Sequence, residues 1–173
     1  MFQIKNIKIS LKITEIPLNS VLEHFQNTNV SYEIKSNYII IKQKFIYVIF
    51  KSKNNFINHI NITKIPDSIN IRVSIEFFIN IILENFKVHV LNYKIDNLTA
   101  IYDMKKEIDQ NKLADKLKTS HIIKFNKEKF PGLFIKLEQG TFIIFHTGKV
   151  NLVGCQNPSH LVTLFKKLNG ILL

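Results

Sequence analysis

The stretch FPGLFIKLEQGTFIIFHTGKVNLVGCQ, residues 130–156, contains three short runs in which apolar residues alternate with other residues. Alternation with a period of two is typical of β-strands with one buried face. Turn-like residues separate the runs at Glu138–Gly140 and in the sequence His-Thr-Gly-Lys, 146–149. We therefore expect strands over 131–138, 141–147 and 149–155.

Helical patterns lie on both sides of these strands. A strand over 93–104 and a polar helix over 107–118 are expected upstream. Downstream, Asn157 suits an N-cap, Pro158 the first helical position and Gly170 the C′ position. The apolar face of this last helix would be Leu161, Leu164, Phe165 and Leu168.

The first half of the chain shows the same kinds of element. Residues 5–13 alternate, and the spacing of Leu18, Val21, Leu22 and Phe25 after Pro17 predicts a short amphipathic helix. Strands are expected over 38–42, 45–52 and 56–62. A mostly apolar helix is expected over 67–85, from the spacing of Ile69, Val73, Phe77 and Ile81.

The two halves repeat one order of elements. Ile4-Lys5-Asn6-Ile7 recurs as Ile95-Asp96-Asn97-Leu98, and FIYVIF at 45–50 recurs near TFIIF at 141–145. A repeat of about ninety residues that is used twice is typical of a pseudo-symmetric domain. We expect repeats over 1–86 and 87–173 that together form one α+β domain.

Composition and charge narrow the class of partner. The 173 residues are 46% hydrophobic and 21% charged, which is typical of a folded domain. The formal net charge is +11, with ten basic and six acidic residues in 1–86 and fourteen and seven in 87–173. Such a charge favours a polyanion, either nucleic acid or an anionic membrane surface.

Catalysis and cofactors have little support in the sequence. The histidines lack metal-ligand spacing, the single cysteine excludes a disulfide framework, and Gly148-Lys149 lacks the upstream glycine of a phosphate loop. The longest apolar stretch, 75–83, is too short for a membrane span, and the N-terminus does not read as a signal peptide. We expect a protein that is not an enzyme, with no metal, no cofactor and no membrane partner.

One sheet face should stay open, because four helices cannot cover both faces of about eight to ten strands. This face would mix apolar, aromatic and amide side chains inside a rim of lysines. Such a surface suits the acceptor-rich minor groove of A·T DNA. The residues expected on it are Asn6, Lys8, Ser10, Ile46, Val48, Phe50, Phe56, Asn58, Asn97, Thr99, Ile101, Ile143, Phe145, Asn151 and Val153.

Residues 130–156 resemble the second repeat of the TATA-binding protein core, whose pattern reads FPGL, a basic residue, a short turn, LIF-x-SGK and a TGAK-like strand. YKIDNLTAIYD at 93–103 resembles the strand that precedes FPGL in that family. IKNIKIS at 4–10 and FIYVIFKSKN at 45–54 resemble the first repeat more weakly. The resemblance implies an α+β saddle, a curved antiparallel sheet with helices on its convex face.

The resemblance also implies a function. It implies a transcription initiation factor that binds and bends the minor groove of A·T-rich, TATA-like promoter DNA and nucleates preinitiation complex assembly. The implied partners are double-stranded DNA and general transcription factors or RNA polymerase subunits. The implied location is the nucleus, or the cytoplasmic site of viral transcription if the source is a virus.

Individual residues match the family's DNA-binding positions. Phe130 and Phe145 match the intercalating pair of the second repeat, and Phe50 matches one member of the first repeat's pair. Asn6 and Asn97 match the central asparagines that donate to base acceptors. The other DNA-binding positions that the resemblance implies are Pro131, Thr99, Ile143, Val48, Val153, Lys8, Lys42, Lys136 and Lys149.

The first repeat departs from the family pattern. Its second phenylalanine falls near Ser36, Asn37 or Tyr38, and Tyr38 is expected to pack rather than intercalate. The acidic stretch that precedes FPGL in the family reads NKEK here, at 126–129. An alternative therefore stays open: a fold of this family that serves mainly as an interaction scaffold in a transcription complex, with weak or no sequence-specific DNA binding.

Overall fold

The computed structural model describes residues 1–172, and backbone contacts divide the chain into two compact units. The N-terminal unit is Asn6–Asp96. The C-terminal unit combines Met1–Lys5 with Asn97–Leu173. Each unit is described by itself, and two long strands, β1 (Gln3–Pro17) and β6 (Val90–Asp103), contribute residues to both.

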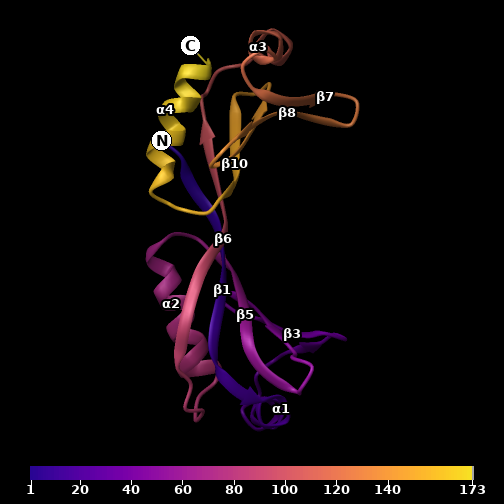
Figure 1. The fold of residues 1–173 in the computed structure, drawn as a ribbon, viewed down its shortest axis with the longest axis vertical. Helices are drawn as coiled ribbons and strands as arrows, with labels where there is room; N and C mark the ends of the chain where they lie inside the picture. The colour runs from indigo at the N-terminus through magenta and orange to yellow at the C-terminus, as the bar shows by residue number, and fades with distance from the viewer. Residues whose placement is uncertain (173) are drawn as a thin grey trace. The chain divides into compact units, whose positions relative to one another are not determined.

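The N-terminal unit combines a β-sheet with helices (Figure 1). Its strands lie in the order β2-β3-β4-β5-β1-β6. Antiparallel pairing joins β3 to β4, β4 to β5 and β5 to β1. Its further elements are α1 (Leu18–Asn27), β2 (Glu33–Ile34), β3 (Tyr38–Lys42), β4 (Ile46–Phe50), β5 (Phe56–Ile65), α2 (Ile69–Phe77) and the π-helical turn η1 (Phe78–Ile82).

The C-terminal unit has the corresponding strand order β6-β10-β9-β8-β7. Its pairs are again antiparallel, from β6 with β10 to β8 with β7. Its further elements are α3 (Gln110–Leu117), β7 (Ile122–Asn126), β8 (Phe130–Leu137), β9 (Gly140–Phe145), β10 (Lys149–Cys155) and α4 (His160–Leu172). None of the helices within residues 1–172 is long and apolar enough to cross a membrane.

Strand alternation builds both cores, as the sequence predicted. On β1 the side chains of Ile7, Ile9 and Leu11 are fully buried. On β9 the buried residues are Phe142 and Ile144, and their neighbours along the strand are half-exposed. The helices cover the buried side, so the other side of each sheet is left open.

The first residues of the chain complete the core of the C-terminal unit. The ring of Phe2 stacks on Phe142 with centroids 5.8 Å apart and meets Phe165 of α4 edge-on at 6.0 Å. Tyr102 packs against the same Phe165 ring at 4.9 Å. An aromatic cluster therefore ties the start of β1 to this unit.

The apolar residues that predicted a helix over 67–85 do not form its buried face. Ile69 is 82% exposed and Ile81 56% exposed, whereas Ile71, Phe78 and Ile82 are buried. The helix is apolar on nearly every side, so periodicity alone could not select the face.

A tertiary contact fixes the orientation of this helix. The buried hydroxyl of Tyr47 donates to the Ser74 carbonyl at 3.0 Å. The side of α2 that is buried is therefore set by a contact with β4, and the sequence of the helix alone does not contain this information.

The other differences concern element ends and short edge strands. The last helix begins at His160 rather than at Pro158, although the Asn157 side chain accepts from Ser159 N as an N-cap residue does, and it continues through Gly170. The edge strands β2 and β7 were not expected from the sequence. Both are short, and edge strands have fewer buried residues to reveal a pattern.

Candidate nucleic-acid interface

The open face of the C-terminal unit consists of the half-exposed residues that alternate with its core. On β6 these are Asn97, Thr99 and Ile101, and buried Leu98 and Ala100 lie between them. On the neighbouring strands they include Ile143, Phe145, Asn151 and Val153. The register places Ile143 beside Asn151 and Thr141 beside Val153.

Three phenylalanine rings gather at the outer part of this face. Phe130 is 41% exposed, and its ring centroid lies 5.9 Å from that of Phe145 and 5.2 Å from that of Phe134. A side chain at Gly132 would collide with the Phe130 ring, since a Cβ there would lie 2.6 Å from it. Gly132 therefore leaves room for the ring beside the sheet, and Pro131 is exposed next to it.

A buried amide supports this aromatic group from the core side. Gln110 begins α3 and is 3% exposed. Its Nε2 donates to the carbonyl of Pro131 at 2.8 Å and to that of Ile144 at 2.7 Å. One side chain therefore ties β8 to β9 directly behind Phe130 and Phe145.

Asn97 accepts a hydrogen bond from a strand bulge. Its Oδ1 lies 2.8 Å from the backbone N of Gly154, where the β10 register shifts and φ is +78°. Because the oxygen faces this N–H group, the amide orientation is determined, and Nδ2 is left as the donor.

Asn6 makes the corresponding contact in the N-terminal unit. Its Oδ1 accepts from Lys64 N at 2.8 Å, at a bulge of β5 where φ of Lys64 is +66°. The difference lies in the donor: Nδ2 of Asn6 donates to Thr63 Oγ1 at 3.3 Å. The residue that corresponds to Thr63 is Val153, which has no hydroxyl.

Strand register identifies the remaining equivalent positions. Thr63 precedes one bulge and Val153 the other, so these two residues correspond. Thr63 pairs with Ile46 and Val153 with Thr141, and four residues further along these strands Phe50 corresponds to Phe145. Phe50 pairs with Tyr38, whereas Phe145 pairs with Gly132. Tyr38 therefore corresponds to Gly132. Two residues earlier in each unit, Ser36 corresponds to Phe130.

Phe50 has packing partners instead of a second phenylalanine. Its ring centroid lies 5.3 Å from that of His59 and 6.2 Å from that of Tyr38. The packing role expected for Tyr38 agrees with this contact. Val48, two residues before Phe50 on β4, is half-exposed and lies opposite Asn61.

The open face of the N-terminal unit is more polar than that of the C-terminal unit. Ser10, expected at the surface, is buried, and its hydroxyl donates to the Asp96 carboxylate and lies 3.1 Å from Asn61 Oδ1. Lys8 is half-buried on the same strand. A carboxylate thus lies among the amides of this face.

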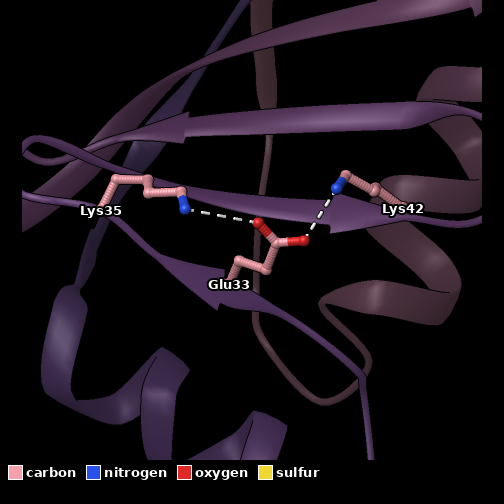
Figure 2. A network of polar contacts seen from close by, with 3 residues as sticks. All are labelled: Glu33, Lys35 and Lys42. Carbon is pink, nitrogen blue, oxygen red and sulfur yellow. Dashed lines mark hydrogen bonds and ion pairs between the residues drawn. The ribbon is translucent and has the colours of Figure 1, made fainter.

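The lysines of the rim differ between the units. Lys136 and Lys149 are exposed in the C-terminal unit. In the N-terminal unit, Lys42 Nζ lies 2.7 Å from Glu33 Oε1, and Lys35 Nζ lies 3.6 Å from Oε2 of the same carboxylate (Figure 2). The hydrogen bond from Lys42, more than its charge, lowers the pKa of Glu33, so this carboxylate is ionised at neutral pH.

Three contributors to this surface were not expected from the sequence. Phe134 and Gln110 lack a motif of their own, although the alternation of β8 places Phe134 on the face of Phe130. Glu33 lies on the unexpected edge strand β2. Within residues 1–172, no group of three or more His, Cys, Asp or Glu side chains could hold a metal ion.

Comparisons with known proteins show what the chain is similar to. Residues 92–173 match the family model of "Transcription factor TFIID (or TATA-binding protein, TBP)". The C-terminal half of the chain is therefore similar to the TATA-binding protein family. This family consists of transcription factors rather than enzymes, in line with the sequence-based expectation.

Sequence relatives match about one half of this chain. A TATA-box-binding protein of Pyrobaculum neutrophilum is 31% identical over 83 residues, which are 47% of this chain and 41% of the relative. A TATA box-binding protein-like 2 of Rattus norvegicus is 35% identical over 89 residues, 50% of this chain and 25% of the relative. The chain thus spans about two fifths or less of these relatives' lengths.

The fold match extends over nearly the whole chain. The TBP of Methanococcus jannaschii superposes with a TM-score of 0.79, covering 99% of this chain and 97% of that one, at 22% sequence identity. The predicted α+β class and TBP-like fold are thereby confirmed. The first half of the chain shares this fold, although it lies outside the residues that the family model matches.

Proposed function

We propose that this protein is a DNA-binding transcription initiation factor that binds and bends the minor groove of A·T-rich, TATA-like promoter DNA. The observation that carries the proposal is the open face of the C-terminal unit, which ends in the half-exposed Phe130–Phe145 ring pair. Apolar wedges of this kind unstack base steps from the minor groove and kink the duplex.

The amide orientations support the same function. Hydrogen bonds to bulge N–H groups hold Oδ1 of Asn6 and Asn97, so each Nδ2 is a donor. The floor of an A·T minor groove offers the acceptors N3 of adenine and O2 of thymine. Thr99, Ile143, Val48 and Val153 would supply apolar contact along the groove.

Lysines would supply the affinity that does not depend on sequence. Lys8, Lys136 and Lys149 would neutralise phosphates and release counterions, so binding should weaken as salt rises. Flexible TA steps would be deformed most easily, so part of the sequence preference would come from deformability. In a eukaryotic cell the protein would act in the nucleus, nucleating preinitiation complexes with general transcription factors or RNA polymerase subunits.

A scaffold role is the second candidate, and one surface favours it. Ile69, Val73 and Ile81 form an exposed apolar stripe along α2 and η1. Exposed apolar patches on soluble proteins mark interaction sites. A protein that served mainly as a scaffold would use this side of the molecule and would need no kinked DNA.

Bending separates the two candidates. We would measure resonance energy transfer between the ends of labelled duplexes, one with a central TATA-like site and one rich in G·C, across a salt series. The proposed function expects the ends of the TATA-like duplex to approach each other, and those of the G·C-rich duplex to approach much less. Salt-sensitive binding of both duplexes without bending would contradict it and favour the scaffold.

A further inference from the structure

Beyond the Phe130–Phe145 pair, the open face of the C-terminal unit continues to the edge strand β7. Two cavities, of about 380 and 330 Å³, adjoin there and share Lys124 and Phe134 as lining residues. We call their combined surface the edge trough. The residues that matter to its chemistry are Lys124, Lys129, Phe130, Phe134, Lys136 and Thr141.

The edge trough has an aromatic floor and a cationic rim. Register places Lys124 directly beside Phe134, and Lys136 beside Thr141. The side chains of Lys124, Lys129 and Lys136 are exposed, and in the described part of the chain none of them forms an ion pair. Glu128 is the one acidic residue of the adjoining 126–129 loop, so the local charge stays positive.

The corresponding edge of the N-terminal unit has an acidic residue at the position of Lys124. Glu33 pairs with Ile40 in β3, as Lys124 pairs with Phe134 in β8. By the register that aligns Phe50 with Phe145, Ile40 corresponds to Phe134, and Lys42 to Lys136. Glu33 therefore stands where the C-terminal unit has Lys124, and it engages both Lys35 and Lys42 (Figure 2).

We infer that the edge trough binds the phosphodiester backbone of duplex DNA just outside the base step that Phe130 and Phe145 contact. The inference rests on the proposed function, which brings DNA to this face. Lysine ammonium groups bind phosphates as point charges, and the trough offers three of them along one edge. In the N-terminal unit, Glu33 competes with phosphate for Lys35 and Lys42 and removes the equivalent site. Backbone contacts would therefore extend further at one end of the bound DNA than at the other.

Salt dependence of DNA binding tests the trough. We would measure affinity by fluorescence anisotropy from low to moderate salt with two duplexes that share one TATA-like core, one ending at the core and one extending beyond both ends. The slope of log K against log salt is negative, and each lost phosphate contact reduces its magnitude by about 0.9. Lys124→Gln should reduce the magnitude of the slope by about this amount on the long duplex and leave it unchanged on the short one. Lys112→Gln, an exposed lysine of α3 in the same unit, is the matched control and should change neither.

Glu33 gives a test of the opposite sign. Glu33→Gln should release Lys35 and Lys42 and steepen the slope on the long duplex by up to about 2, from two new contacts. Glu23→Gln, an exposed acid of α1 in the same unit, should leave the slope unchanged. An unaltered slope in Glu33→Gln would overturn the part of the inference that concerns the N-terminal unit.

The outcomes keep this inference separate from the proposed function. Bending of the TATA-like duplex with an unchanged slope in Lys124→Gln would overturn the edge trough and leave the proposed function standing. An equal change of slope on both duplexes would also overturn it, because the contact would then lie within the core site. A lowered slope without bending would contradict the proposed function and retain the trough as a backbone site.

Discussion

The two units share a strand order and a bulge-bound asparagine, yet their open faces differ. The C-terminal unit presents Phe130 and Phe145 side by side, and Asn97 keeps a donor with no hydroxyl neighbour at Val153. In the N-terminal unit Ser36 replaces one phenylalanine, and Asn6 donates to Thr63. The fold is maintained by the buried residues of each strand, so the residues between them were free to diverge.

This difference separates the residues that maintain the fold from the residues that form the open face. Core residues such as Ile49 and Ile144 are fully buried in both units, which explains how the fold persists at low sequence identity. Under the proposed function, Phe130 and Phe145 would both insert at one base step, whereas the N-terminal unit has Ser36 in place of one of the two rings. We therefore expect an asymmetric complex, in which deformation is concentrated at the end that meets the C-terminal unit.

Removing the wedges should have the largest effect on binding. Replacing Phe130 and Phe145 together by alanine should weaken binding to TATA-like DNA by about 4 kcal/mol, roughly a thousandfold, since each ring is a central apolar anchor. Bending should disappear with the affinity. Phe50→Ala is the matched variant in the other unit and should cost about 1 kcal/mol, because it has no partner wedge. Equal losses in the two variants would refute the asymmetry.

The second-largest effect is expected for Gln110, which lies behind Phe130 and Phe145, and it concerns folding stability. Gln110→Leu leaves the carbonyls of Pro131 and Ile144 without the partner that Gln110 supplies, and should lower the free energy of unfolding by about 2 kcal/mol. Asn111→Leu, at the exposed neighbouring position of α3, should change it by less than about 0.5 kcal/mol. Chemical denaturation measures both variants. A neutral Gln110→Leu would show that the two carbonyls find other partners.

Much of this architecture followed from the sequence, for a physical reason. Strand alternation and the FPGL stretch revealed the core and the Phe130–Phe145 pair, because both depend on residues close together in the chain. The face of α2 could not be predicted, since its orientation depends on Tyr47, which meets Ser74 from a distant strand.

The polar partners of the site were equally hidden from the sequence. Asn6 and Asn97 were recognisable as unusual strand residues, but the bulges at Lys64 and Gly154 that orient them are 57 or 58 residues away. The charge network of Glu33 depends on β2, whose two residues are too few to show a pattern.

The asparagines allow stability and DNA contact to be separated. Asn97→Asp keeps an acceptor for Gly154 N but replaces the donor by a carboxylate facing the groove. Stability should change by less than about 1 kcal/mol, whereas binding of A·T-rich DNA should fall by about 2 kcal/mol, roughly thirtyfold. Asn6→Asp should lose less affinity, because Nδ2 of Asn6 is already shared with Thr63. A parallel loss of stability and binding in Asn97→Asp would indicate a purely structural residue.

The smallest effect concerns the bulges themselves. Lys64 and Gly154 occupy equivalent positions with positive φ, a conformation that costs a non-glycine residue about 1 kcal/mol or more. Lys64→Gly should therefore relieve strain in the N-terminal unit, although part of the gain is offset by the greater freedom of glycine in the unfolded chain. The net expectation is a stabilisation of about 0.5 kcal/mol. Gly154→Ala should destabilise by about 1 kcal/mol through backbone strain alone, because no atom lies within 4 Å of the added Cβ. If thermal denaturation showed both substitutions to be destabilising, the two bulges would differ in more than their side chains.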